Sequence, residues 1–190
     1  MKVSFLALSL AVSLSLVVSD VGADDAFHID AVHSSVLFRI KHMNVSYAYG
    51  RFNKISGKFS INETDPGKSF LELDIDVETI DTANEARDRH LKGPDFFNAK
   101  QFPSISFRSK SVRKVSTGYT VSGDLTLHGV TKPVDLDLTV VGTGKGMKGE
   151  TISGLEGSLN LKRSDFGMTY MVGPIGDEVR VSASVEGSHP

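Results

Sequence analysis

The feature that most restricts the fold is a strict alternation of apolar and polar side chains across residues 71–78, within a segment that spans residues 69–79. The apolar residues share one parity and the acidic residues the other: Leu71, Leu73, Ile75 and Val77 against Glu72, Asp74, Asp76 and Glu78. Because successive side chains of a strand point to opposite faces, this pattern predicts a strand that buries one face. Its acids fall about 7 Å apart along a line. We therefore interpret them as a solvated outer face rather than a cation site.

The same alternation recurs along the chain and predicts about eight strands. They fall at residues 27–43, 51–62, 69–79, 104–115, 119–127, 133–143, 151–163 and 178–185. A parity slip near Ser56 and Gly57 predicts a bulge, and residues 142–149 are expected to form a flexible glycine-rich loop. Many amphipathic strands joined by turns indicate an all-β antiparallel sandwich or closed barrel. We favour closure, because no predicted edge is interrupted by proline or inward charge.

One charged insert separates two of these strands. Residues 84–92 are expected to form a short helix, with Asp81 or Thr82 as its cap and Gly93-Pro94 as its end. Phe96 and Phe97 follow, and Gln101-Phe102-Pro103 leads back into a strand. Such an insert suits the mouth of a barrel, where it covers one end while the strands build the wall.

The first 23 residues read as a targeting segment. Lys2 precedes an apolar run, and the small residues of Val21-Gly22-Ala23 resemble a signal-peptidase site. The expected organisation is a signal peptide at 1–23 and one domain at 24–190, exported to the periplasm or secreted, with no integral membrane segment after cleavage. The chain has no cysteine, which excludes disulfides and thiolate chemistry. Its net charge of −2 gives no indication of nucleic-acid binding.

No catalytic or metal-binding motif emerges from the residues. The six histidines form no His-Glu-x-x-His or Cys/His cluster, and His33 and His42, nine apart in one expected strand, should face opposite sides. No Gly-x-Ser-x-Gly elbow is present. We therefore expect no catalytic residue, metal or cofactor. The most notable polar group, Arg87, Asp88 and His90, either pins the insert to the barrel rim or forms a collar around a ligand head group.

Five sequence blocks resemble the YceI family and occur in the family's order. They are HIDAVHSSVLFRIKHM, GRFNKISGKF, VETIDTANEARDRHLKGPDFFNAKQFPSISFRS, VSGDLTLHGVTKPVDLDL and RSDFGM followed by GDEVRVSASVE. The resemblance spans nearly all of residues 24–190. It implies an extended, lipocalin-like antiparallel barrel of eight strands. It also implies an exported protein that binds polyisoprenoid or other long amphiphilic lipids, a quinone among them, and it supplies no catalytic residues.

Three functions remain open at this point: a non-catalytic lipid carrier or sequestering protein, an enzyme acting on an isoprenoid lipid, and a solid-core module for a membrane-bound redox partner. A homodimer is also left open. An eight-stranded barrel either fills its interior or holds one small ligand. The residues expected to contact lipid are Val36, Phe38, Ile40, Phe52, Leu71, Leu73, Ile75, Phe96, Phe97, Phe102, Phe107, Leu125, Leu127 and Leu136.

Overall fold

The computed structural model describes residues 26–190, so the expected signal peptide at 1–23 lies outside the described residues. The described chain forms one sheet of eleven antiparallel strands. These are β1 Phe27–Ile29, β2 Ser35–His42, β3 Ser46–Phe52, β4 Ile55–Ser60, β5 Phe70–Asp76, β6 Ile80–Asp81, β7 Ser104–Val115, β8 Gly118–Leu127, β9 Val130–Lys145, β10 Thr151–Lys162 and β11 Ile175–His189. One α-helix, α1 (Glu85–Lys92), lies between β6 and β7, and short 3-10 turns include η3 (Val77–Thr79) and η4 (Arg163–Phe166).

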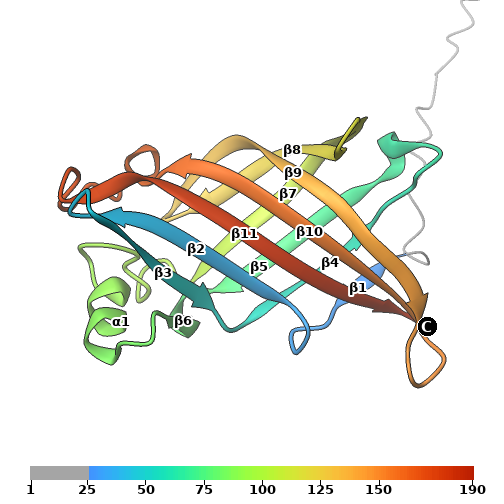
Figure 1. Cartoon of the computed structure of the whole chain (residues 1–190), viewed down its shortest axis with the longest axis horizontal. Coiled ribbons are helices and arrows are strands. Elements are labelled where there is room, and N and C mark those ends of the chain that lie inside the picture. Colours follow the sequence, from blue (N-terminus) through green and yellow to red (C-terminus); the bar gives the residue numbers. More distant parts are fainter. Residues whose placement is uncertain (1–25) are drawn as a thin grey trace, which may run out of the picture.

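The sheet closes into a barrel because β1 pairs with β4 on one edge and with β11 on the other. Three of the strand positions around the barrel are each shared by two consecutive strands, which follow one another along the same line: β1 with β2, β3 with β4, and β5 with β6. For example, β1 and β2 share one edge of β11, with His28 opposite Ser188 and Val36 opposite Ala183. When each shared position is counted once, the barrel has eight strand positions. The predicted eight-stranded antiparallel barrel is therefore confirmed. Figure 1 shows how the strands are arranged around it.

The prediction of one continuous strand over 27–43 is wrong. The chain leaves the sheet at residues 30–34, and Val32, which has the same parity as the buried Val36, is 85% exposed. The cause is local: the backbone N–H of Val32 donates to Asp30 Oδ1 at 2.7 Å and closes a turn. Such side-chain hydrogen bonds compete with strand pairing.

Two other local predictions are also wrong. The register of β4 on β5 runs unbroken through Ser56 and Gly57, so no bulge lies there. The change of parity falls at residues 53–54, between β3 and β4. The expected loop at 142–149 is shorter, because β9 continues to Lys145 and Gly144 lies opposite Ile152 on β10.

One end of the barrel is packed solid. Phe59 is completely buried and stacks on Phe27 with ring centroids 5.3 Å apart. Val112, Tyr119 and Val121 are also buried near the far ends of β7 and β8. These side chains fill the barrel where β1, β4 and the end of β11 meet, so any opening must lie elsewhere.

The other end carries α1, beside β3 and β6 (Figure 1). The predicted helix is confirmed, but its cap is Asn84 rather than Asp81 or Thr82: the Asn84 side chain accepts from the backbone N–H of Arg87 at 3.0 Å. Gly93 ends the helix, and the Gly93 N–H donates to the carbonyl of His90. In the part of the chain described, no helix has the length and apolarity needed to span a bilayer.

Candidate functional site

A cavity of about 610 Å³ occupies the barrel between the packed end and α1. Small-molecule sites typically measure roughly 300–1,000 Å³. At about 30 Å³ per water-sized group, the space holds on the order of 20 carbon-sized groups. The interior is therefore open rather than filled by side chains.

The cavity reaches solvent beside α1. Within the described chain, residues 46–50 of β3 lack a strand on one side, because β6 pairs only with Arg51 and Phe52. Tyr47 and Tyr49 line the cavity although they are 49% and 59% exposed. Met43, Tyr170 and Met171 likewise line the cavity and remain exposed; their backbone segments are linked where the Met43 N–H donates to the Pro174 carbonyl at 2.7 Å. These five side chains form the mouth.

Most of the residues proposed from the sequence for lipid contact lie on the cavity wall. Thirteen of them line it: Val36, Phe38, Ile40, Phe52, Leu71, Leu73, Ile75, Phe96, Phe97, Phe107, Leu125, Leu127 and Leu136. Phe102 does not. Its ring packs edge-on against His128 with centroids 4.8 Å apart and covers Gly129, where a side chain would collide with the ring. The backbone turn that brings Phe102 N–H to the Asn98 carbonyl directs it there.

The sequence-based set missed one side of the wall. Apolar residues of β9, β10 and β11 also line the cavity: Leu138, Leu155, Leu159, Leu161, Val179, Val181, Ala183 and Val185. The signal was available for β11, because its apolar residues all share one parity. Parity also identifies Leu159 and Leu161 of β10, but the bulge between Gly154 and Leu155 disturbs the pairing with β9.

Thr82 and α1 form a compact polar network beside the cavity. Arg87 Nε donates to Thr82 Oγ1 at 2.7 Å, and Arg87 Nη2 donates to the Thr82 carbonyl. The Thr82 N–H donates to Asp88 Oδ1 at 2.9 Å, and its hydroxyl donates to the same oxygen. Arg87 and Thr82 line the cavity, whereas Asp88 does not, because its carboxylate is turned to Thr82. The network fixes α1 to the rim and leaves a guanidinium at the cavity.

His90 belongs to the same rim but to a different set of contacts. Its Nε2 lies 3.1 Å from Asp95 Oδ2, and its ring meets Phe96 and Tyr170 edge-on with centroids 5.0 and 5.8 Å away. Phe96 is itself only 6% exposed, and its ring also contacts Tyr170 at 5.4 Å. This cluster joins the helix to the segment before β11, so two sides of the rim hold each other in place.

Arg163, at the start of η4, was not singled out from the sequence. Arg163 is only 3% exposed, and it lines the cavity. Burial lowers the pKa of its guanidinium, and the nearby charge of Asp177 opposes that effect. No pattern could have revealed it, because an arginine just after a strand is ordinarily a surface residue.

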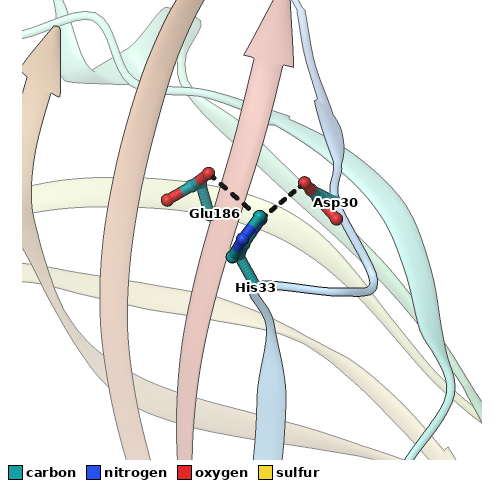
Figure 2. Close-up of side chains that lie close together, drawn as sticks. All are labelled: Asp30, His33 and Glu186. Atoms are coloured by element: carbon teal, nitrogen blue, oxygen red, sulfur yellow. Dashed lines mark hydrogen bonds and ion pairs between the residues drawn. The ribbon is translucent and has the colours of Figure 1, made fainter. Parts of the chain in front are cut away.

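A separate polar cluster lies on the outside of the barrel, at the turn of residues 30–34 between β1 and β2. His33 Nδ1 is 2.8 Å from Asp30 Oδ2 and 3.7 Å from Glu186 Oε1, as Figure 2 shows. The hydrogen bond and charge of Asp30, with Glu186, raise the pKa of His33, and the hydrogen bonds from His33 and Val32 lower the pKa of Asp30. Sequence reasoning missed this cluster because Glu186 is distant in the chain. The contacts of His33 with Asp30 and Glu186 hold the 30–34 turn against β11.

Comparison with known proteins places the chain in a family. The model of the YceI-like domain matches residues 27–187. The UPF0312 protein of Yersinia pestis is 38% identical over 184 residues, covering 97% of this chain and 96% of the relative. The UPF0312 protein of Yersinia enterocolitica is 39% identical over 169 residues, covering 89% and 88%.

Solved structures share the fold. BcnA of Burkholderia cenocepacia superposes with a TM-score of 0.76 at 26% identity, covering 84% of this chain and 99% of that one. The YCEI protein of Campylobacter jejuni gives 0.70 at 27% identity, covering 96% and 99%. A polyisoprenoid-binding domain of Saccharophagus degradans, implicated in plant cell wall breakdown, gives 0.65 at 19% identity, covering 86% and 98%. The barrel and the matched family model together identify this chain as a member of the YceI family.

Proposed function

We propose that the barrel binds a polyisoprenoid or similar long-chain amphiphilic lipid in its cavity, and carries or sequesters it without catalysing a reaction. The observation that carries the proposal is the open apolar interior of about 610 Å³. The YceI family and the shared fold of a polyisoprenoid-binding domain support it. Quinones with isoprenoid tails belong to the same ligand class.

The cavity suits a ligand that binds by desolvation. Space for on the order of 20 carbon-sized groups corresponds to about four isoprene units. At about 0.8 kcal/mol per buried methylene, that chain gains at most about 16 kcal/mol. This exceeds or matches an association cost of about 4–15 kcal/mol. Hydrocarbon burial alone is therefore sufficient for binding, and the polar rim is free to set orientation and selectivity.

Arg87, Asp88 and His90 form the proposed head-group collar. Arg87 and His90 line the cavity, whereas Asp88 acts through Thr82. Arg87→Ala removes two hydrogen bonds to Thr82 and is expected to lower the free energy of unfolding by about 1–3 kcal/mol. It should also weaken lipid binding. Lower stability with unchanged lipid affinity would discard Arg87 from the collar.

Native mass spectrometry of protein purified without detergent tests the proposal. We expect a fraction of the protein to carry an added mass in the isoprenoid range, and the remainder to take up added polyprenol. The same spectra report whether two copies of the chain associate. Consistently bare protein that takes up no polyprenol would overturn the carrier function. Conversion of the bound lipid, lost on His90→Ala, would favour the enzyme instead.

We further propose that residues 1–23 direct export and are removed, placing the barrel in the periplasm or outside the cell. The apolar run after Lys2 and the small residues before Asp24 support this. Intact-mass measurement of the protein from its native source should give a chain that begins at or within a few residues of Asp24. A cytoplasmic chain that retains Met1 would contradict it.

A further inference from the structure

The polar cluster of Asp30, His33 and Glu186 on the outside of the barrel brings together three side chains that can bind a metal ion. Asp30 and His33 come from the 30–34 turn and Glu186 from β11, and their side chains point toward one another (Figure 2). The atoms His33 Nδ1, Asp30 Oδ2 and Glu186 Oε1 all lie within 4.8 Å of one another. A motif search misses such a set, because Glu186 is far from the other two in the chain.

The spacing of these atoms suits a small divalent ion. Zinc binds imidazole nitrogen and carboxylate oxygen at about 2.0–2.2 Å, so donor atoms at tetrahedral angles lie about 3.4 Å apart. The distances from His33 Nδ1, 2.8 Å to Asp30 and 3.7 Å to Glu186, fall on either side of that value. A modest rotation of the partly exposed Glu186 side chain brings its oxygen into place without moving the backbone.

Backbone contacts hold the three residues in position independently of any ion. The Asp30 N–H donates to the Glu186 carbonyl at 2.9 Å, and the Glu186 N–H donates to Ser34 Oγ at 3.0 Å. The Val32 N–H donates to Asp30 Oδ1, which leaves Asp30 Oδ2 for the cluster. Ion binding therefore orders little of the chain, and ordering is a cost that ordinarily lowers affinity.

The two carboxylates share the histidine as their one close basic neighbour. No lysine or arginine nitrogen of the described residues lies within 4.0 Å of Asp30 or Glu186. Apart from the contact of His90 with Asp95, every other ion pair in the described part of the chain uses lysine or arginine. Two negative charges held close together repel, and a divalent cation between them offsets both.

We propose that Asp30, His33 and Glu186 bind a zinc ion on the outer surface of the barrel. Zinc fits better than magnesium or calcium, because imidazole suits zinc whereas those ions take oxygen ligands. The ion replaces the hydrogen shared by His33 Nδ1 and Asp30 Oδ2, and water completes its coordination. The bound ion links the 30–34 turn to β11 and so stabilises the fold. The site is separate from the lipid cavity, whose described lining includes none of the three residues.

Calorimetric titration of Zn²⁺ into the mature protein, stripped with a chelator and free of any histidine tag, tests the proposal. We expect one ion per chain. Excess Zn²⁺ should also raise the melting temperature, because a ligand that binds only the folded state stabilises it. Mg²⁺ and Ca²⁺ at the same concentration should do neither, and binding of either ion as tight as that of Zn²⁺ would overturn ligation by the imidazole.

Three variants each remove one ligand and preserve the turn. His33→Gln, Asp30→Asn and Glu186→Gln should each weaken Zn²⁺ binding at least about 10- to 100-fold, the loss that even outer-shell partners of a metal produce. Asp30→Asn keeps an oxygen that can accept from the Val32 N–H, and Glu186→Gln leaves the backbone contacts of that residue intact. Both variants should therefore fold, and Zn²⁺ should no longer raise their melting temperatures.

His28→Gln is the matched control, because it removes an exposed histidine of β1 that lies outside the cluster. Zn²⁺ affinity should be unchanged in this variant. An affinity lowered as much by His28→Gln, or retained in all three cluster variants, would place the ion elsewhere and overturn the proposal. A protein that binds no Zn²⁺ would overturn it as well, while lipid binding, measured separately, would be unaffected.

Discussion

Replacing Ala183 with tryptophan should close the cavity without disturbing the barrel. Ala183 lies midway along β11, between Val36 on β2 and Gly157 on β10, and its side chain lines the cavity. An indole at this position projects into open space rather than into packed neighbours. The substitution therefore tests the cavity itself, with no change to the charged rim.

The structure gives the expected size of the effect. The substitution adds about nine heavy atoms, which at about 30 Å³ each occupy on the order of 270 Å³. That is a little under half of the cavity of about 610 Å³. Displacing about nine ligand carbons forfeits about 3 kcal/mol at 0.3 kcal/mol per atom, or about 7 kcal/mol at 0.8 kcal/mol per methylene. Lipid affinity should fall at least about 100-fold.

Calorimetric titration with geranylgeraniol and thermal unfolding together provide the assay. Because the sequence contains no tryptophan, fluorescence of residue 183 also reports directly on its surroundings. Ser184→Trp places the same side chain on the exposed outer face of β11 and should leave affinity unchanged. If Ala183→Trp instead lowered stability by the ~1–3 kcal/mol of an overpacked core while affinity stayed constant, the open interior would be refuted.

Two further predictions concern the barrel wall. Gly57→Ala should lower the free energy of unfolding by about 2 kcal/mol or more in denaturant titrations, because Gly57 has φ of +140° and an added Cβ would collide with the Glu72 carbonyl. Gly142→Ala, where no atom lies within 4 Å, should be tolerated, and equal losses in both variants would contradict the reasoning. The raised pKa of His33 means that its contact with Asp30 stabilises the folded protein below its usual pKa of 6.5 and ceases to do so as pH rises through the raised value. His33→Gln should therefore remove this part of the pH dependence of the melting temperature. An unchanged profile would show that the contact between His33 and Asp30 contributes nothing to stability.

The barrel could be predicted from the sequence because period-two alternation is preserved along most of each strand, although bulges interrupt it in β7 and where β9 pairs with β10. On β5 and β8 in particular, inward and outward side chains alternate without error. The helix could also be predicted from the sequence, because its polar composition differs sharply from that of the flanking strands and because Gly93 ends it. These signals are local, and the structure retains them.

What the sequence could not show depends on contacts between distant segments. The break at residues 30–34 begins with a local aspartate turn, but the hydrogen bond from the Asp30 N–H to the Glu186 carbonyl, which fixes that turn against β11, joins residues far apart in the chain. Phe102 shares the apolar character of Phe97 yet faces His128, because a backbone turn redirects it. Arg163 is buried only because three carbonyls from a later segment surround it. Parity also cannot distinguish a residue that lines a cavity from one that fills it.

Affinity measured against chain length tests the central claim most directly. Prenols of two to six isoprene units, titrated under identical conditions, should bind progressively more tightly up to about four units, the length that a cavity of about 610 Å³ encloses. Each unit should add about tenfold or more, since five carbons contribute about 1.5 kcal/mol at the lower limit of 0.3 kcal/mol per atom. Beyond that length the affinity should level off. An affinity independent of chain length from the shortest prenol onward would contradict lipid binding in the barrel interior.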